Sequence, residues 1–116
     1  MKPALFHIID KATWSDARQR AQYAPASFEV EGFIHLSRRE QILRPANLLY
    51  QGRTDLCLLV IDPARLEGEV VMERGSHGEA ELFPHLYGWL NIDAVDRVIE
   101  FPCNEDGAFT LPVELD

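Results

Sequence analysis

Six consecutive apolar residues, Leu56–Ile61, are the feature that most narrows how this chain can fold. An apolar run of this length predicts a buried β-strand. The run is far too short to cross a bilayer as a helix, which needs about 20 apolar residues. We therefore expect a globular fold that contains β-structure, and we expect no membrane partner.

Other short apolar runs predict further strands. They occupy Leu5–Ile9, Phe33–Leu36, Val70–Met72, Val95–Phe101 and Phe109–Val113. Each run has the length of a strand, and glycine, proline and asparagine residues mark turns between them. The last two runs are expected to close the sheet, with a turn at 104–107 between them.

Two helices are also expected. Thr13 precedes the first as its N-cap. Ser37 and Glu40 have the S-x-x-E spacing of a capping box and predict the start of the second. Pro45 must kink this second helix or begin a new turn, because it lacks an N–H donor. Gly52 ends the segment.

Together these elements predict an α+β fold, with a small mixed, mostly antiparallel sheet and two or three helices packed on it. The chain has 116 residues. A chain of this mass can bury roughly two-thirds of its surface, which is enough for one core. Residues 1–116 are accordingly expected to form a single domain.

The net charge of −8 argues against bulk nucleic acid as a partner, because such binding depends on basic side chains that displace counterions from phosphates. The first ten residues lack the long apolar stretch of a signal peptide, so a cytoplasmic location is expected. Cys57 and Cys103 do not suggest a disulfide framework, and Cys57 lies within the buried run. The four histidines lack the spacing of zinc ligands, so no metal is expected.

The segment GFIHLS, residues 32–37, is the first candidate for a functional site. Burying the imidazole of His35 is unfavourable unless its ring nitrogens find partners. Ser37 lies two residues further on and shares a face with His35 in an extended strand. Both side chains could project into one pocket. The alternative is a core histidine that is bonded to a backbone carbonyl.

The segment FPHLYG, residues 83–88, is the second candidate. His85 and Tyr87 also share one face of an extended segment. Their polar tips and apolar flanks would suit a groove that stacks a planar ring and holds its edge. The alternative is a structural loop that closes one end of the core.

The polar stretch 73–81 is expected to form a loop. Glu73 stands at its start, where a strand-end carboxylate opposite a histidine and a tyrosine could act as an acid or base or orient a hydroxyl. The alternative for Glu73 is a solvated strand terminus. His77 is expected at an exposed loop tip without a catalytic role.

GFIHLS and FPHLYG, in this order and at this separation, resemble a family of short bacterial single-domain proteins of unknown function. The resemblance extends roughly from Phe6 to Phe101. The family is grouped by fold similarity with the ADP-ribosyltransferases, whose split, mixed sheet binds NAD in a cleft. The resemblance therefore implies an ADP-ribosyltransferase-like fold with NAD as a possible ligand.

The resemblance also implies roles for individual residues. His35 and Ser37 match the residues that hold the NAD ribose, Tyr87 is the first candidate to stack on nicotinamide, and Tyr50 is the second. Glu73 would orient a ribose hydroxyl and steady the transition state, although it precedes FPHLYG, where the family order places this glutamate later. The other glutamates that could take this role are Glu81 and Glu100.

Arg38 and Arg39 follow GFIHLS directly and give this segment a local positive charge. A helix N-terminus nearby would favour an anion, so Arg38 is a candidate ligand-binding residue. The function expected first is a small-ligand pocket built from the two motifs, for NAD or an ADP-ribose-like ligand. The alternatives are an ADP-ribosyltransferase-type enzyme, with His35 and Glu73 as catalytic residues, and a structural or interaction protein without a ligand.

Overall fold

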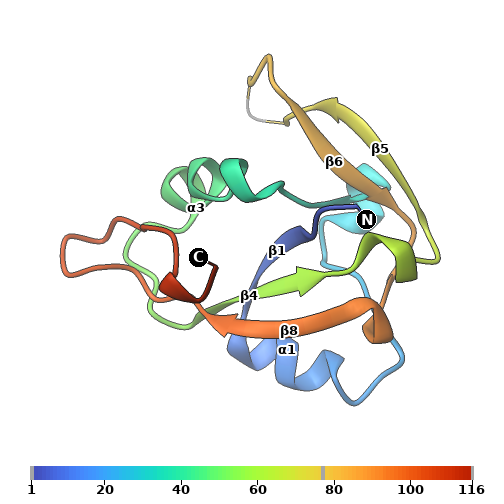
Figure 1. Ribbon diagram of the computed structural model, residues 1–116, viewed down its shortest axis with the longest axis horizontal. Helices are drawn as coiled ribbons and strands as arrows, with labels where there is room; N and C mark the ends of the chain where they lie inside the picture. Colours follow the sequence, from blue (N-terminus) through green and yellow to red (C-terminus); the bar gives the residue numbers. More distant parts are fainter. Residues whose placement is uncertain (1, 77, 116) are drawn as a thin grey trace.

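The computed structural model describes residues 2–76 and 78–115. Its first sheet contains the strands β1 (Leu5–Asp10), β4 (Leu56–Ile61) and β8 (Val95–Glu100), in the order β1-β4-β8. The strand predicted from the apolar run therefore forms, and it occupies the centre of this sheet (Figure 1).

All six residues of β4 are buried, because its two faces belong to two separate apolar clusters. Side chains alternate across a strand. Cys57, Leu59 and Ile61 accordingly pack in one cluster with helix α1 (Lys11–Ala17). Leu56, Leu58 and Val60 pack in the other with helix α3 (Leu43–Leu49). Figure 1 shows the two helices on opposite sides of β4.

The second sheet has the order β3-β6-β5, formed by β3 (Ile34–His35), β6 (Leu82–Tyr87) and β5 (Glu69–Arg74). The backbones of Phe6 and Ser37 join it to β1, since each N–H donates to the other's carbonyl at 2.8 Å. A separate ribbon pairs β2 (Gln22–Tyr23) with β7 (Leu90–Asn91). Figure 1 shows β5 and β6 as a long hairpin that extends from the first sheet.

Every strand pair in the described ranges is antiparallel. The α+β class and the antiparallel character are confirmed, but the expected mixed sheet is wrong. A parallel pair needs a crossover connection between its strands, and no strand pair in the described ranges is joined in this way.

The two expected helices begin differently from the prediction. Asp10, not Thr13, caps α1, because its carboxylate accepts from both the backbone N–H (2.9 Å) and the hydroxyl (2.7 Å) of Thr13. An aspartate accepts at an N-cap as well as threonine does, so the sequence allowed either residue. The helix ends at Ala17.

The capping box predicted at Ser37 and Glu40 is wrong. Ser37 is occupied in the bridge to Phe6, and the backbone N–H of Arg38 donates to the side chain of Gln41 at 3.0 Å. A 3₁₀ turn, η1 (Arg39–Gln41), precedes α3, and Pro45 lies in the first turn of α3, where its missing N–H is tolerated. Gly52 follows two residues after Tyr50, the C-cap of α3.

A short helix that the sequence did not predict, α2 (Phe28–Glu31), precedes GFIHLS. Gly32 ends it with φ of 82°, a left-handed conformation that glycine adopts without strain. Short 3₁₀ turns complete the chain: η2 (Pro63–Arg65), η3 (Ile92–Ala94) and η4 (Val113–Leu115). Asp62 caps η2, as the Asp-Pro sequence indicates.

The strand expected at Phe109–Val113 does not form. The amide side chain of Asn47 on α3 takes the place of a neighbouring strand at Phe109. Its Oδ1 accepts from the Phe109 N–H at 2.7 Å, and its Nδ2 donates to the Phe109 carbonyl at 3.4 Å. Phe109 thereby packs against Phe101 without pairing with β8.

Replacing Asn47 by alanine is expected to lower the free energy of unfolding by about 1–2 kcal/mol, because both backbone groups of Phe109 lose their partner. Asn47→Asp keeps the acceptor for the Phe109 N–H, so its free energy of unfolding is expected to fall less than that of Asn47→Ala. Urea denaturation of the three proteins measures the difference. Equal stability of Asn47→Ala and the parent would contradict this role.

Cys57 is buried in the core, as expected, and burial raises the pKa of its thiol to about 11. Within residues 2–76 and 78–115, no helix has the length and apolar composition needed to cross a bilayer.

Candidate functional site

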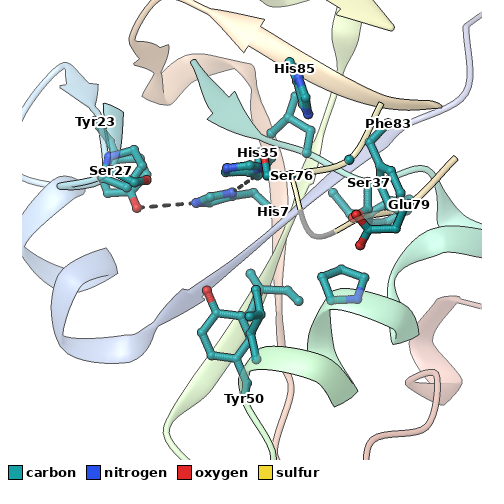
Figure 2. Close-up of a pocket in the computed structure, with 17 residues that line it drawn as sticks. His7, Tyr23, Ser27, His35, Ser37, Tyr50, Ser76, Glu79, Phe83 and His85 are labelled. Carbon is teal, nitrogen blue, oxygen red and sulfur yellow. Dashed lines mark hydrogen bonds between the residues drawn. The ribbon is translucent and has the colours of Figure 1, made fainter. Parts of the chain in front are cut away.

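A pocket of about 150 Å³ opens between the two sheets, where β1, β3 and β6 meet α3 and its C-cap Tyr50 (Figure 2). Three histidines from three distant parts of the chain line it: His7, His35 and His85. Apolar side chains form much of the remaining wall, among them Phe6, Ile8, Leu36, Leu49 and Phe83.

His7 lies in the middle of β1 and is almost fully buried. Its Nδ1 lies 2.8 Å from the His35 carbonyl, which can only accept, so Nδ1 carries the hydrogen and donates. Its Nε2 then accepts from the Tyr23 hydroxyl at 3.4 Å. Burial lowers the pKa of His7 to about 4, so the ring is neutral near pH 7. Sequence reasoning missed His7, although a histidine within an apolar strand was its signal.

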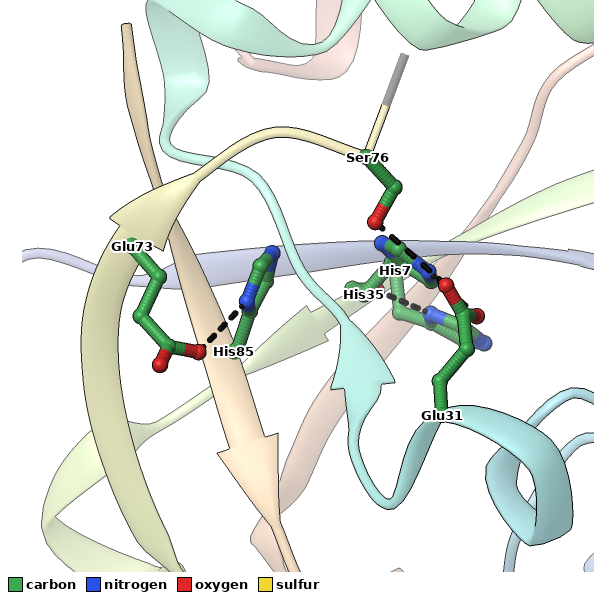
Figure 3. Close-up of polar contacts among 6 residues, drawn as sticks. All are labelled: His7, Glu31, His35, Glu73, Ser76 and His85. Carbon is green, nitrogen blue, oxygen red and sulfur yellow. Dashed lines mark hydrogen bonds and ion pairs between the residues drawn. The ribbon is translucent and has the colours of Figure 1, made fainter. Parts of the chain in front are cut away.

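His35 is held by a carboxylate from α2. Its Nε2 lies 2.8 Å from Oε1 of Glu31, and the Ser76 hydroxyl donates to the other oxygen of Glu31 at 3.4 Å (Figure 3). The αL turn at Gly32 folds α2 back, so that Glu31 reaches the histidine four residues later. The unpredicted helix α2 explains why Glu31 was not among the candidates.

His85 is held by a carboxylate on the neighbouring strand. Its Nδ1 lies 2.8 Å from Oε1 of Glu73, and the same oxygen accepts from the Tyr87 hydroxyl at 2.6 Å. The hydrogen bond from Tyr87, and then that from His85, lowers the pKa of Glu73, while the bond to Glu73 raises the pKa of Tyr87. Glu73 is thus an ionised acceptor with two donors.

Phe33 lies between the two carboxylate–histidine pairs. Its ring stacks on His85 at a centroid distance of 4.0 Å and an interplanar angle of 15°. It meets His35 edge-on at 4.9 Å. These contacts restrict the tilt of both imidazoles, a role for Phe33 that sequence reasoning did not assign.

Ser37 and Tyr50 also line the pocket, and burial raises the pKa of the Tyr50 hydroxyl. Glu79 brings a carboxylate into the wall, where its side chain is only 6% exposed and pairs with Nε of Arg44 at 3.3 Å. Gly75 leaves room for it, since a Cβ there would lie 2.3 Å from Glu79 Oε1. Among the described residues that line the pocket, none is lysine or arginine.

Four of the residues named from the sequence therefore meet at one pocket: His35, Ser37, Tyr50 and His85. Glu73 does not begin a loop but lies within β5, next to His85. Neither Glu73 nor Tyr87, which lies on β6, is among the residues that line the pocket. His77 lies outside the described residues.

The charged candidates lie elsewhere. Arg38 is not among the lining residues and forms ion pairs with Glu40 at 3.4 Å and Glu81 at 3.9 Å. Of the competing glutamates, Glu81 accepts from the Gln41 amide at 2.9 Å, and Glu100 pairs with Lys11. Across the part of the chain that the structure describes, no group of three His, Cys, Asp or Glu is placed to hold a metal ion.

The fold and sequence are similar to those of known proteins. The crystal structure of protein CC0527 from Caulobacter crescentus has a TM-score of 0.82 and 29% identity, and the match covers 93% of this chain and 94% of that one. A double mutant of CC0527 gives a TM-score of 0.81 at 28% identity with the same coverage. Its solution NMR structure gives 0.73 at 30% identity, covering 93% of this chain and 92% of that one.

No curated protein matches the sequence. One protein family matches residues 8–98, which include both motifs and most of the pocket. Because the match spans most of the chain, the protein belongs to this family, described as "Protein of unknown function (DUF952)".

Proposed function

We propose that the protein binds a small ligand in the pocket between GFIHLS and FPHLYG. The observation that carries this proposal is the convergence of three histidines with Ser37 and Tyr50, from separate segments, on one partly apolar cavity. Pockets that combine apolar walls with a few polar groups aimed inward are typical of small-molecule sites.

The volume restricts what the pocket can enclose. About 150 Å³ is well below the 300–1,000 Å³ of sites that enclose a drug-sized ligand, so it suits one ring-sized group. NAD or an ADP-ribose-like ligand would place only its nicotinamide or a ribose inside. Since none of the lining residues that the structure describes is lysine or arginine, its phosphates would lie outside the pocket.

ADP-ribosyltransferase-type catalysis is the second candidate function. The presence of His35, Ser37 and Tyr50 around one cavity favours it, because these residues match those that hold ribose and nicotinamide in that group of enzymes. The carboxylate in the wall belongs to Glu79, whereas Glu73 holds His85 from outside. A transferase would therefore depend on Glu79 more than on Glu73.

Adding NAD, ADP-ribose or nicotinamide is the direct test. A ligand at 100 times its dissociation constant is expected to stabilise the fold by about 2.7 kcal/mol, which raises the melting temperature by on the order of 10 °C. Differential scanning fluorimetry measures this shift. No shift with any of the three at millimolar concentration would count against a pocket for this class of ligand.

Removing the Ser37 hydroxyl from the pocket wall tests whether the ligand binds in this pocket. Ser37→Ala is expected to weaken binding about fivefold, because one hydrogen-bonding group is lost. Its backbone bridge to Phe6 does not involve the side chain, so the fold is kept. Ser15→Ala on the exposed face of α1 is the matched control. Equal affinities of the two variants would move the site elsewhere.

His35→Ala separates the pocket from a purely structural role. A ligand site predicts lost binding, whereas a structural histidine predicts a lower melting temperature with binding kept.

A further inference from the structure

We propose that Nε2 of His85 is the pocket's hydrogen-bond acceptor for an uncharged ligand group that carries an O–H or N–H, with Glu73 and Tyr87 as positioning residues. This inference rests on the proposed pocket and names the chemistry of its occupant. Its basis is one atom: Nε2 of His85 is buried and has no hydrogen-bond partner among the described residues.

The contacts of the ring determine which nitrogen carries the hydrogen. Oε1 of Glu73 is an ionised acceptor that already receives the Tyr87 hydroxyl at 2.6 Å, so it can only accept from Nδ1 of His85 at 2.8 Å. A neutral imidazole has one N–H, which is therefore on Nδ1, and Nε2 keeps its lone pair. Figure 3 shows Nε2 on the side of the ring away from Glu73.

The surroundings of Nε2 leave it without a partner in the free protein. The atom is closed to solvent, and no described hydrogen-bond partner lies within reach. His85 itself is only 2% exposed. A buried polar atom without a partner is unfavourable, and a ligand donor in the pocket would satisfy it.

The ring is also held in place, as a site needs. Glu73 holds Nδ1, Phe33 stacks on one face, and His85 lines the cavity while Glu73 and Tyr87 do not. A hydrogen bond to one ring nitrogen from outside a site fixes the tautomer and the orientation of a histidine. The other nitrogen is then directed at the ligand in a defined form.

The remaining wall determines the charge of the ligand. Glu79 brings a carboxylate that is paired with Arg44, the neutral His7 contributes no charge, and none of the described lining residues is lysine or arginine. A carboxylate or phosphate would meet the Nε2 lone pair and the Glu79 carboxylate without a lining cation of its own. An uncharged ring with an amide or hydroxyl donor satisfies Nε2 and the apolar wall together.

Nicotinamide and nicotinate test the ligand class, because the two have the same shape and differ in amide against carboxylate. In ¹H–¹⁵N NMR titrations of the full chain at pH 7.5, nicotinamide is expected to bind at least tenfold more tightly. Nicotinate binding as tightly would overturn this inference and leave the proposed pocket intact. If neither compound binds, and NAD and ADP-ribose also give no shift, the proposed function and this inference both fail.

The tautomer is tested without any ligand. Long-range ¹H–¹⁵N spectra of the free protein are expected to show His85 with its hydrogen on Nδ1. Glu73→Val removes the acceptor and is expected to release the ring to the other tautomer and to weaken nicotinamide about tenfold, or 1.4 kcal/mol. Glu69→Val is the matched control, since Glu69 lies exposed on the same strand and has no bond to His85.

Tyr87→Phe covers the case in which Glu73→Val does not fold. It keeps the Glu73–His85 bond, so the Nδ1–H tautomer is expected to persist with a smaller loss of affinity. A hydrogen on Nε2 of His85 in the parent protein would overturn the inference whatever binds, as would equal affinities of Glu73→Val and Glu69→Val.

Discussion

Lowering the pH from 7 to 4.5 is expected to remove about 2.4 kcal/mol of the free energy of unfolding through the imidazole of His7. Burial lowers the pKa of His7 in the folded protein from 6.5 to about 4. The unfolded chain therefore binds a proton below pH 6.5 that the folded chain does not take up. Stability contributed by the neutral ring is present above pH 6.5 and is lost as the pH falls toward 4.

Urea denaturation at half-unit steps of pH measures this loss, and His7→Gln is the comparison. The variant is less stable at pH 7, but its free energy of unfolding is expected to fall less between pH 6.5 and 4.5. The lowered pKa values of Glu73 and Asp10 belong to carboxylates, which lose their stabilising effect below about pH 4.5 and so outside most of this interval. Parallel curves for parent and variant would rule out His7 as the source.

Replacing Leu59 by alanine is expected to lower the free energy of unfolding by about 4 kcal/mol, the larger effect of the two. Leu59 is fully buried at the centre of β4, with β1 on one side and β8 on the other. Strands on both sides limit how far the backbone can move to fill the cavity. Chemical denaturation measures the change.

Two controls define the cause of that loss. Leu59→Met conserves volume and is expected to cost less than about 1.5 kcal/mol. Val98→Ala is the second control. Val98 lies opposite Leu59 on β8, but it is 41% exposed, so its replacement removes little buried surface. If Val98→Ala were as damaging as Leu59→Ala, burial would not explain the effect.

The strands were the most predictable part of this fold. The runs at Leu5–Ile9, Leu56–Ile61 and Val95–Phe101 all form strands within about one residue of the expected bounds, because consecutive apolar residues of strand length have few other ways to be buried. The run at Phe109–Val113 carried the same local signal. It failed because Asn47, 62 positions away, supplies the hydrogen bonds of a neighbouring strand.

The candidate site was predictable in part for a similar reason. His35 was identified because imidazole is unfavourable in an apolar segment unless it is paired, and His85 because it shares one face of an extended segment with Tyr87. Of their partners, Glu73 was already a candidate carboxylate opposite a histidine and a tyrosine, whereas Glu31 depends on structure that local pattern does not reveal. Glu31 approaches His35 through the turn at Gly32, and Glu73 approaches His85 through the pairing of β5 with β6.

The sequence by itself determined which segments must be buried and which side chains would need a partner once they were. The tertiary structure decided which partners they received: that His7 joins His35, that Glu73 bonds His85 from outside the pocket lining, and that Glu79 reaches the pocket wall. Burial is a property of each segment's own composition. Hydrogen bonds between residues far apart in the chain depend on strand register and turn geometry, which follow from how all segments pack together.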